Sequence, residues 1–528
     1  MQLTTQRFLV PVAVVLTLVA RTHGAEAAPT VPDGFGVEVM TNDVTQPASI
    51  AFLPDGRLLI VEQRSGKVRL LRGTSVTTIG TVPSVNSSAN ERGLLGIAVD
   101  PQWPTHPYVY VHYTASSDPH VHISRFRVSG DLSNTGAGTL TMDVASRYDL
   151  VNDIPDNQTI HNGGTVRFGP DGKLYDSIGE DSSPCVAQDK TVLGGKILRL
   201  DVSRLPDGPG TATRALVTPS DNPFVTNSDP DARLVWAWGL RNPFRLQIDP
   251  QTGVAYVTDV GEDGWEELDR LDQGGLDFGW PMREGPVSHG TSCASNLPAQ
   301  TEPIWAYSHA AEEDNLEALA IMNAGVYRDR SNGTGAARFP AGYSGNVFVS
   351  DYYVGHMWRL VGSNNSWSLA PAVAGQPSAE HWGEGFSTVS DYALGPDGAL
   401  WYCQQFVGGF SGPGEIGRVI AENHSTPPPN PTPMPPIAML SAVYPQPSAA
   451  SATLPFTLAQ QARVDVKIYD LRGRRVRELV EPETRAAGSY AEIWDGLDDD
   501  GRKVDAGLYF VRLGAGGHQY EWRVVIAR

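Results

Sequence analysis

The sequence repeats a short phrase that decides its fold, first as Phe52-Leu-Pro-Asp-Gly-Arg-Leu-Leu-Ile-Val61. The phrase returns as Phe168-Gly-Pro-Asp-Gly-Lys-Leu-Tyr175 and Leu394-Gly-Pro-Asp-Gly-Ala-Leu-Trp401, and looser copies begin near residues 99, 248 and 343. Each copy is a Pro/Asp/Gly turn followed by alternating apolar residues, which is typical of a hairpin that opens a strand. Six such units predict an all-β fold, a six-bladed β-propeller in which each blade packs against its neighbours. A single sandwich of short strands is the competing fold, but the repeat region is too long for one.

The composition and charge of the chain indicate how many domains it has and which kinds of molecule it could bind. The chain has 528 residues, enough for at least two domains, and its 55 glycines and 40 prolines favour turns and short strands. Its net charge of −19 argues against a nucleic-acid partner, because contacts with phosphates need a basic surface. An acidic protein suits neutral substrates or cations such as Ca²⁺.

Residues 1–27 have the pattern of a cleaved secretory signal peptide. Arg7 precedes an apolar run over 8–20, and Ala25-Glu-Ala27 supplies a small-residue cleavage site. The run is short for a membrane span, and no later run reaches about 18 apolar residues. We therefore expect a secreted, periplasmic or cell-surface protein without a transmembrane segment in the mature chain. An uncleaved membrane anchor is the less favoured alternative.

Two domains joined by a Pro-rich linker follow from the composition along the chain. Seven of the thirteen residues from His424 to Pro436 are proline, which is typical of an extended spacer. We expect the propeller over 31–422, a Pro-rich linker over 423–440 and a small Ig-like β-sandwich over 441–528, where residues such as Ala462–Tyr469 alternate in polarity. The three cysteines allow one disulfide at most and leave the pairing open: Cys185, Cys293 and Cys403.

Four stretches stand apart from the repeats and carry candidate site residues. In a propeller the loops that open the innermost strands converge, so these stretches are expected to meet at one site. They are Glu91-Arg-Gly-Leu-Leu-Gly96, His161-Asn-Gly-Gly164, Trp238-Gly-Leu-Arg-Asn-Pro-Phe-Arg245 and a stretch from Asp259-Val-Gly-Glu-Asp-Gly-Trp-Glu-Glu-Leu-Asp269 to Phe278-Gly-Trp-Pro281.

Each stretch allows a functional and a structural interpretation. His161 stands before glycines that let a ligand approach the backbone, and an imidazole exchanges protons near neutral pH; a loop histidine bonding across blades is the alternative. Arg241 and Asn242 are suited to binding a carboxylate or quinone oxygen; the alternative is that Arg241 forms ion pairs with acidic residues. The acidic loop that begins at Asp259 is suited to binding Ca²⁺; the alternative is a solvent-exposed turn.

Taken in order, the four stretches resemble the soluble quinoprotein glucose/sorbosone dehydrogenase family, and so does Gln188-Asp-Lys-Thr-Val-Leu-Gly-Gly-Lys-Ile-Leu-Arg-Leu-Asp201. The family is a six-bladed propeller that uses pyrroloquinoline quinone (PQQ) and Ca²⁺ to oxidise aldoses to lactones. The resemblance implies an exported sugar dehydrogenase that acts on an aldose or oligosaccharide and passes electrons to an external acceptor.

The resemblance also implies roles for individual residues. His161 is the expected base that takes the sugar hydroxyl proton. Cofactor contacts are expected from Arg241 and Asn242, and from Glu91, which occupies a position where sugar-oxidising members have glutamine. Metal ligands are implied at the backbone carbonyls of Gly261 and Glu262, and for a second, structural Ca²⁺ at Glu266 and Glu267.

Departures from the family pattern support an alternative function. The positions of a family glutamine, lysine and pair of arginines align with Phe244, with Tyr353 and with residues near Thr388 and Ser390. PQQ carries three carboxylates, which need cations. The alternative is a non-catalytic propeller that binds a glycan or protein, as in the branch that includes Hedgehog-interacting protein. A Ca²⁺-dependent lactonase-type hydrolase is a third, weaker hypothesis.

The C-terminal segment has a resemblance of its own. Tyr444-Pro-Gln-Pro447, Trp494-Asp-Gly496 and Gly507-Leu-Tyr-Phe-Val-Arg-Leu513 are similar to motifs in the Ig-like domains of flagellar hook-capping proteins and of type IX secretion C-terminal domains. This resemblance implies contact with outer-membrane secretion or cell-surface machinery. A spacer or adhesion module is the alternative.

Overall fold

The computed structural model divides the chain into two compact units, Met1–Ser425 and Thr426–Arg528. It describes residues 28–527 except 89, 135–137, 291–292, 294–299, 310–318, 332–334, 409–411, 423–437, 441–447, 449–450, 459, 471–473 and 516–517. The predicted signal peptide and most of the predicted linker lie outside the described residues. No helix in the described ranges is long and apolar enough to cross a membrane.

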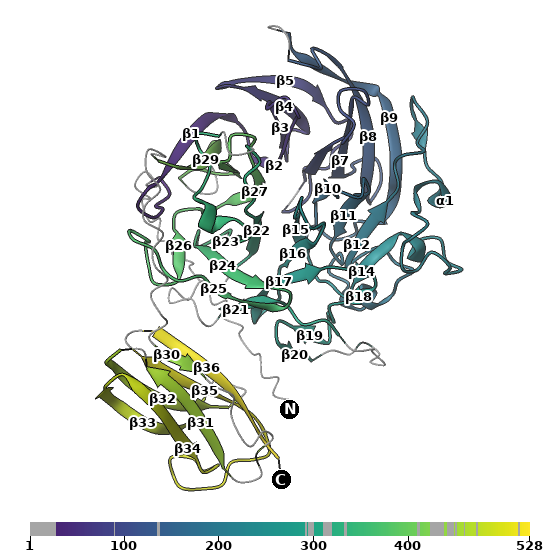
Figure 1. Ribbon diagram of the computed structural model, residues 1–528. Helices are drawn as coiled ribbons and strands as arrows, with labels where there is room; N and C mark the ends of the chain where they lie inside the picture. The colour runs from purple at the N-terminus through teal and green to yellow at the C-terminus, as the bar shows by residue number, and fades with distance from the viewer. Residues whose placement is uncertain are drawn as a thin grey trace, which may run out of the picture. The chain divides into compact units, whose positions relative to one another are not determined.

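The described strands of the first unit form six sheets of four or five strands (Figure 1). The first three sheets contain β2 (Pro47–Phe52), β3 (Leu58–Glu62), β4 (Lys67–Arg72) and β5 (Ser75–Thr81); β6 (Leu94–Val99), β7 (Tyr108–Thr114), β8 (His120–Gly130), β9 (Leu140–Pro155) and β13 (Gly210–Thr211); and β10 (Val166–Phe168), β11 (Leu174–Ile178), β12 (Lys196–Leu200), β14 (Val235–Trp238) and β18 (Leu276–Asp277).

The other three sheets continue the pattern. They contain β15 (Pro243–Ile248), β16 (Ala255–Asp259), β17 (Trp265–Leu271) and β21 (Trp305–Ser308); β22 (Ile321–Val326), β23 (Val347–Asp351), β24 (Met357–Ser363), β25 (Ser366–Leu369) and β26 (His381–Gly383); and β27 (Val389–Leu394), β28 (Leu400–Gln404), β29 (Gly414–Ala421) and β1 (Phe35–Val44). A small hairpin of β19 (Arg283–Glu284) and β20 (Val287–Ser288) and one short helix, α1 (Arg214–Val217), are additions to this framework.

The sheets form a closed ring around their first strands. These strands, β2, β6, β10, β15, β22 and β27, contact one another in that order, and β27 also contacts β2. Figure 1 shows β2, β10, β15, β22 and β27 around the centre of the unit. The fold is therefore a β-propeller, as the repeats predict.

The repeated Pro/Asp/Gly phrase forms the turn between the first and second strands of a sheet. In the first copy the Gly56 amide donates to the Leu53 carbonyl at 3.0 Å, and Gly56 has a φ of 88°, which favours glycine. The other two close copies connect β10 to β11 and β27 to β28 in the same way. The predicted hairpins are confirmed. The loops that precede the first strands lie at the other end of those strands from the Pro/Asp/Gly turns.

A buried polar network joins the first strands to one another. Arg245 on β15 is almost fully buried and donates to the carbonyl of Ala48 at 2.7 Å. Asp391 on β27 accepts from Ser49 at 2.7 Å and from Arg167 on β10 at 2.6 Å. Because buried charges need partners, this network fixes the register between sheets that are distant in sequence.

The ring is closed by pairing between the two ends of the unit. β1 pairs antiparallel with β29, from Phe35 opposite Ala421 to Val44 opposite Gly414. One sheet therefore combines three late strands with the first strand of the unit, which removes an exposed sheet edge.

The second unit is a small β-sandwich. One sheet contains β30 (Ala438–Leu440), β31 (Ala452–Leu458) and β34 (Gly488–Trp494), and the other contains β33 (Arg475–Arg485), β32 (Ala462–Tyr469), β35 (Gly507–Ala515) and β36 (His518–Ile526). Alternate residues of β32 are buried with Trp494 in one core, as the alternation predicts. Residues 438–440, the end of the predicted linker, form a strand of this unit.

Candidate functional site

Three loops that open first strands meet around the carboxylate of Glu91. Its Oε2 accepts from the backbone amides of His161 at 3.0 Å and Asn162 at 3.2 Å, and from Asn242 Nδ2 at 3.1 Å. These loops precede β6, β10 and β15. One side chain thus connects three sheets and fixes the backbone that carries His161.

His161 is buried and paired with a carboxylate. Its Nδ1 lies 2.6 Å from Oε1 of Glu180, and its backbone has a φ of +61°, a region in which side chains other than glycine are uncommon. With Glu180 ionised, Nδ1 carries the proton and Nε2 keeps the lone pair. Glu180 lies two residues beyond β11 and is held by donation from its amide to the Arg241 carbonyl at 2.9 Å.

The glycines after His161 make room for neighbouring strands. A Cβ on Gly163 would lie 2.3 Å from the Ser177 carbonyl oxygen, and one on Gly164 would lie 2.7 Å from Cβ of Leu95. The glycines predict the close approach of a ligand to this backbone. In the structure the approaching groups belong to the protein.

Arg241 and Asn242 are fixed through their backbone by a buried acid. Their amides donate to the two oxygens of Asp259 at 2.8 and 2.7 Å. The Asn242 side chain is occupied, because it donates to Glu91 and accepts from the Gly163 amide at 3.1 Å.

The guanidinium of Arg241 keeps unused hydrogen-bonding capacity. Its Cζ lies 5.5 Å from the centroid of the Trp280 ring, and its Nη1 donates to the Val260 carbonyl at 3.0 Å. Its Nε is buried and has no hydrogen-bond partner within the described part of the chain. An anionic ligand could use this donor.

The loop between β16 and β17 wraps around the buried carboxylate of Glu284. Oε1 of Glu284 accepts from four successive amides, those of residues 262–265, at 2.6 to 3.3 Å. In a trans peptide the carbonyl points opposite to the amide hydrogen. The carbonyls of Gly261 and Glu262 therefore point away from Glu284, on the side where a cation could bind.

Glu266 and Glu267 lie on opposite faces of β17, because successive strand residues alternate. Glu266 Oε1 lies 2.9 Å from His309 Nε2, and its Oε2 accepts from the Ile321 amide at 3.0 Å. Burial raises the pKa of Glu266 to about 7. The structure does not bring this adjacent pair together as one set of ligands.

Glu267 instead belongs to a buried group of three carboxylates with Asp259 and Asp269. One oxygen from each lies within 4.8 Å of the other two. Both oxygens of Asp269 are buried and have no hydrogen-bond partner among the described residues. Burial raises the pKa of Asp259 to about 7, and burial and mutual repulsion raise the pKa of Glu267 well above its usual value. Either protons or a cation must neutralise this group.

The residues that were aligned with a family glutamine, lysine and pair of arginines are all uncharged here. Thr388 is buried and donates through Oγ1 to the Phe406 carbonyl at 2.6 Å, and Ser390 is buried and donates to the Pro47 carbonyl at 2.9 Å. Tyr353 is 40% exposed, and the Phe244 ring lies 4.2 Å from the guanidinium of Arg245.

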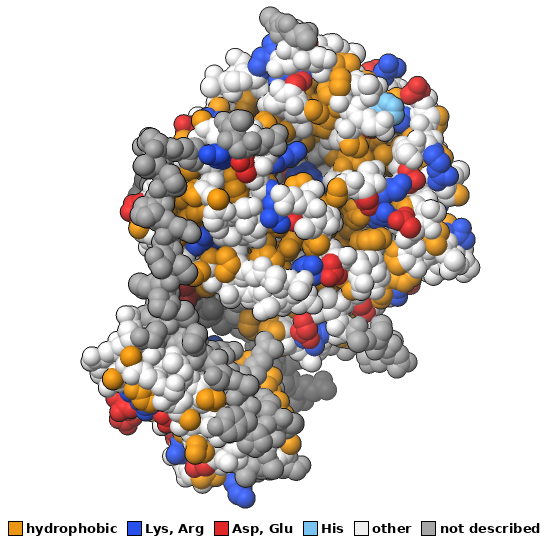
Figure 2. Space-filling view, in the orientation of Figure 1, with side chains coloured by type: hydrophobic (Ala, Val, Ile, Leu, Met, Phe, Trp, Pro, Cys, Tyr) orange, Lys and Arg blue, Asp and Glu red, His pale blue; other side chains and the backbone are white. Residues whose placement is uncertain are grey.

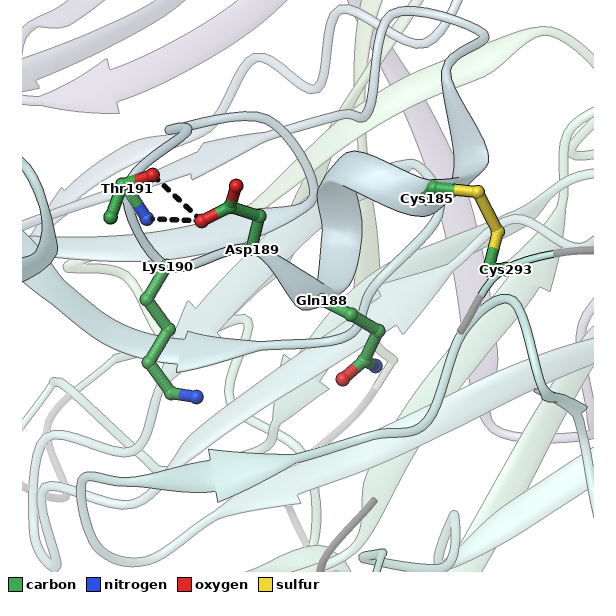
Figure 3. Close-up of a pocket in the computed structure, with 6 residues that line it drawn as sticks. All are labelled: Cys185, Gln188, Asp189, Lys190, Thr191 and Cys293. Atoms are coloured by element: carbon green, nitrogen blue, oxygen red, sulfur yellow. Dashed lines mark hydrogen bonds between the residues drawn. A yellow bond between two sulfur atoms is a disulfide. The ribbon is translucent and has the colours of Figure 1, made fainter. Parts of the chain in front are cut away.

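A disulfide links Cys185 to Cys293, with their Cα atoms 5.5 Å apart, and Cys403 is a buried free thiol. Figure 3 shows the bridge beside the 3₁₀ turn Pro184–Gln188. The bridge and residues 188–191 line a hollow of about 440 Å³. The Lys190 side chain extends into this region, and its Nζ lies 3.8 Å from the centroid of the Trp238 ring.

The Lys196 side chain binds the backbone of the segment that lines this hollow. Its Nζ is buried and donates to the carbonyls of Val186, Ala187 and Gly194 at 2.9, 3.0 and 2.5 Å. Burial lowers its pKa to about 7. The Gly-Gly-Lys part of the family-like stretch thus fixes the connection between β11 and β12, the connection that also contains Glu180.

Family comparisons agree with this fold. Residues 44–328 match the family model of glucose/sorbosone dehydrogenases, and residues 442–518 match that of the FlgD Ig-like domain. The chain belongs to the glucose/sorbosone dehydrogenase family.

The matching relatives include a plant HIPL protein, a bacterial aldose sugar dehydrogenase and Hedgehog-interacting protein. The chain is 34% identical over 218 residues to the HIPL2 protein of Arabidopsis thaliana, covering 38% of this chain and 30% of the relative. It is 28% identical over 266 residues to aldose sugar dehydrogenase YliI of Escherichia coli K12, covering 49% and 65%. It is 28% identical over 233 residues to mouse Hedgehog-interacting protein, covering 40% and 31%. The chain thus spans between 30% and 65% of these relatives' lengths.

A solved structure supports the propeller assignment. The PQQ-bound aldose sugar dehydrogenase of Streptomyces coelicolor matches with a TM-score of 0.51 and 23% identity, over 74% of this chain and 99% of that one.

Proposed function

We propose that the first unit is an exported quinoprotein-type sugar dehydrogenase that oxidises an aldose or oligosaccharide to its lactone with PQQ and Ca²⁺. The observation that carries the proposal is the pairing of buried His161 with Glu180. This pair holds the imidazole in the orientation and tautomer that a base needs. Membership of the family supports the same reaction class.

The residues around His161 fit the cofactor at two points. The unpartnered Nε of Arg241 would donate to a PQQ carboxylate or quinone oxygen, beside the Trp280 ring. The outward carbonyls of Gly261 and Glu262 would hold Ca²⁺, which prefers oxygen ligands. Bound PQQ supplies a hydride acceptor, and bound Ca²⁺ supplies Lewis acidity.

The chain's own side chains then have distinct tasks. His161 Nε2 takes the proton of the sugar hydroxyl, and Glu180 stabilises the imidazolium that forms. Glu91 and Asn242 act as positioning residues, because their side-chain atoms bind the protein backbone and each other. The electrons leave to an external acceptor.

A second Ca²⁺ is proposed at Glu267, together with Asp259 and Asp269. Three carboxylates and unpartnered oxygens on Asp269 match the ligand preference of this ion. Glu266 is not part of this proposal, because its side chain lies on the opposite face of β17 from Glu267 and pairs there with His309.

Two measurements on the full chain test the proposed function. PQQ is titrated in the presence of Ca²⁺, and the melting temperature and quinone absorption are followed; saturable binding with a rise in melting temperature is expected. The His161→Ala variant should then load PQQ as wild type does and lose sugar oxidation. Equal turnover by that loaded variant would refute the assignment of the base.

A second candidate function is a non-catalytic propeller that binds a glycan or a protein. The buried, neutral Thr388 and Ser390 favour it, because neither can pair with a cofactor carboxylate. Absence of PQQ binding at about tens of micromolar would support this alternative and count against the dehydrogenase.

We also propose that the mature protein acts outside the cytoplasm and that the Ig-like unit attaches it to secretion or cell-surface machinery. The match of residues 442–518 to the FlgD Ig-like domain supports this role. Expression with and without residues 441–528, followed by fractionation of the host, tests it; identical distribution of both chains would refute the role.

A further inference from the structure

Three side chains of types that can ligate metals meet at the turn between β7 and β8. The sequence there is Asp118-Pro-His-Val-His122, and one atom from each of Asp118, His120 and His122 lies within 4.8 Å of the other two. His120 and His122 are two apart at the start of β8, so both side chains project from the same face of the strand. This cluster is separate from the residues around His161 described above.

The distances match the spacing of ligands around one ion. Oδ1 of Asp118 lies 3.2 Å from His120 Nδ1 and 2.9 Å from His122 Nε2. Ligand atoms at about 2.0–2.1 Å from a tetrahedral Zn²⁺ lie about 3.3 Å from each other. Because all three atoms already lie within 4.8 Å of one another, side-chain rotations would place them around a cation.

The backbone of this turn is held in place by hydrogen bonds. The Ala115 amide donates to the His120 carbonyl at 2.9 Å, and the Asp156 amide donates to the Pro119 carbonyl at 2.8 Å. The His122 side chain is 3% exposed, whereas those of His120 and Asp118 are 34% and 37% exposed. The cluster therefore has a buried base and an open side, where water or another ligand could complete the coordination.

The ligand types select a class of ion. Two imidazole nitrogens and one carboxylate suit Zn²⁺ and similar transition-metal ions, whereas Ca²⁺ and Mg²⁺ prefer oxygen ligands throughout. We propose that Asp118, His120 and His122 form a binding site for a divalent transition-metal ion such as Zn²⁺.

Arg147 opposes this binding in the structure. Its Nη2 lies 2.7 Å from His122 Nδ1, so Nδ1 is the acceptor and Nε2 carries the proton that faces Asp118. A metal on Nε2 needs that proton to move to Nδ1, where it would face the guanidinium. Arg147 must then turn towards Asp149, to which its Nε already donates at 2.7 Å. The Tyr113 hydroxyl lies 3.5 Å from His122 Nδ1 and becomes the nearest acceptor for the proton on that nitrogen.

The cluster is connected to the loop that carries His161. Asp156, whose amide binds the Pro119 carbonyl, also accepts from Asn162 Nδ2 at 3.1 Å. Asn162 directly follows His161. A cation that rigidifies the turn at Pro119 would therefore stabilise this loop as well.

The test is a Zn²⁺ titration of the full chain against a chromophoric chelator, with Ca²⁺ in excess so that oxygen-rich sites are filled. Loss of even an outer partner of a metal ligand costs about 10- to 100-fold in affinity, so His120→Ala should weaken binding at least 10-fold. The matched control is His106→Ala, an exposed histidine in the turn between β6 and β7 of the same sheet, which should bind as wild type does. Co²⁺ should give an absorption spectrum of imidazole ligation that the His120→Ala variant lacks.

Equal Zn²⁺ affinity in His120→Ala and wild type would overturn the proposal, as would no binding by wild type below about 100 μM. Arg147→Met provides a test in the opposite direction, because removing the guanidinium frees Nδ1 to carry its proton. This variant should bind Zn²⁺ several-fold more tightly than wild type. Weaker binding by a folded Arg147→Met protein would contradict the tautomer argument.

Discussion

Lys196→Met tests whether the buried amine supports the connection between β11 and β12. In wild type the amine donates to three carbonyls. Methionine fills similar volume but cannot donate, and each carbonyl that loses its partner costs about 1–3 kcal/mol. Loss of the buried amine itself offsets part of this cost. We expect the variant to be less stable than wild type by about 3 kcal/mol at pH 7.

The cost should grow as the pH rises. Burial lowers the pKa of Lys196 to about 7, against about 10.4 in an unfolded chain. Between these values the unfolded chain binds one proton more than the folded protein, so raising the pH stabilises the fold. Integration from pH 7 to pH 9 gives a gain of about 2 kcal/mol for wild type. The methionine variant lacks this gain, so the difference should reach about 5 kcal/mol at pH 9.

Urea unfolding at pH 7 and pH 9, followed by tryptophan fluorescence, measures the difference. Comparing the two proteins at each pH cancels the titration of all other groups. Lys173→Met is the matched control, because that partly exposed amine pairs with Asp201 at 2.9 Å, and its loss should cost less than about 1 kcal/mol. A Lys196→Met difference that stays constant or shrinks with pH would refute the argument.

Three further predictions concern the site. Glu180→Gln should lower the kcat of the PQQ-loaded protein about 100-fold or more, because the imidazolium loses its counter-charge; an unchanged kcat in a dye-reduction assay would exclude the pair from catalysis. Calorimetry should show that wild type gains about 2.7 kcal/mol of stability at a Ca²⁺ concentration 100 times the Kd. The Asp269→Asn variant should gain less, because it loses a ligand of the proposed ion. The exposed Asp263→Asn variant is the control and should gain as much as wild type. Cys185→Ser should cost about 2–5 kcal/mol, and an equal loss should appear when wild type is reduced; no loss in urea unfolding would contradict a native disulfide.

Local signals made much of the fold predictable. The Pro/Asp/Gly turns are encoded within a few residues, so the hairpins from Phe52 and Leu394 could be identified from sequence, and β-alternation identified the second unit. The pairing of β1 with β29 could not be, because nothing near residue 35 specifies a partner near residue 421. Strand pairing over such a separation depends on the assembled ring.

The sequence allowed us to predict which loops meet at the site, but not which side chains pair with one another there. Glu91, His161 and Asn242 were correctly placed together by the rule that loops opening first strands converge. Glu180 and Glu284 were missed, because each is a single acid outside the quoted motifs and acquires its importance from groups supplied by other loops. A Gly-Glu-Asp just beyond a buried strand was the one available signal for Glu180.

Closure of the propeller by β1 and β29 has a consequence for how this protein folds. Strand β1 must find a partner roughly 380 residues away, and closing a flexible loop of that length costs on the order of 5 kcal/mol of entropy. During synthesis five sheets can assemble from neighbouring hairpins while β1 remains without its partner. The high contact order of this last step makes ring completion slow relative to hairpin formation, and the late species exposes two sheet edges that are prone to intermolecular pairing. Residues 35–44 thus act as a latch, and a chain that lacks them should accumulate as an open ring that aggregates.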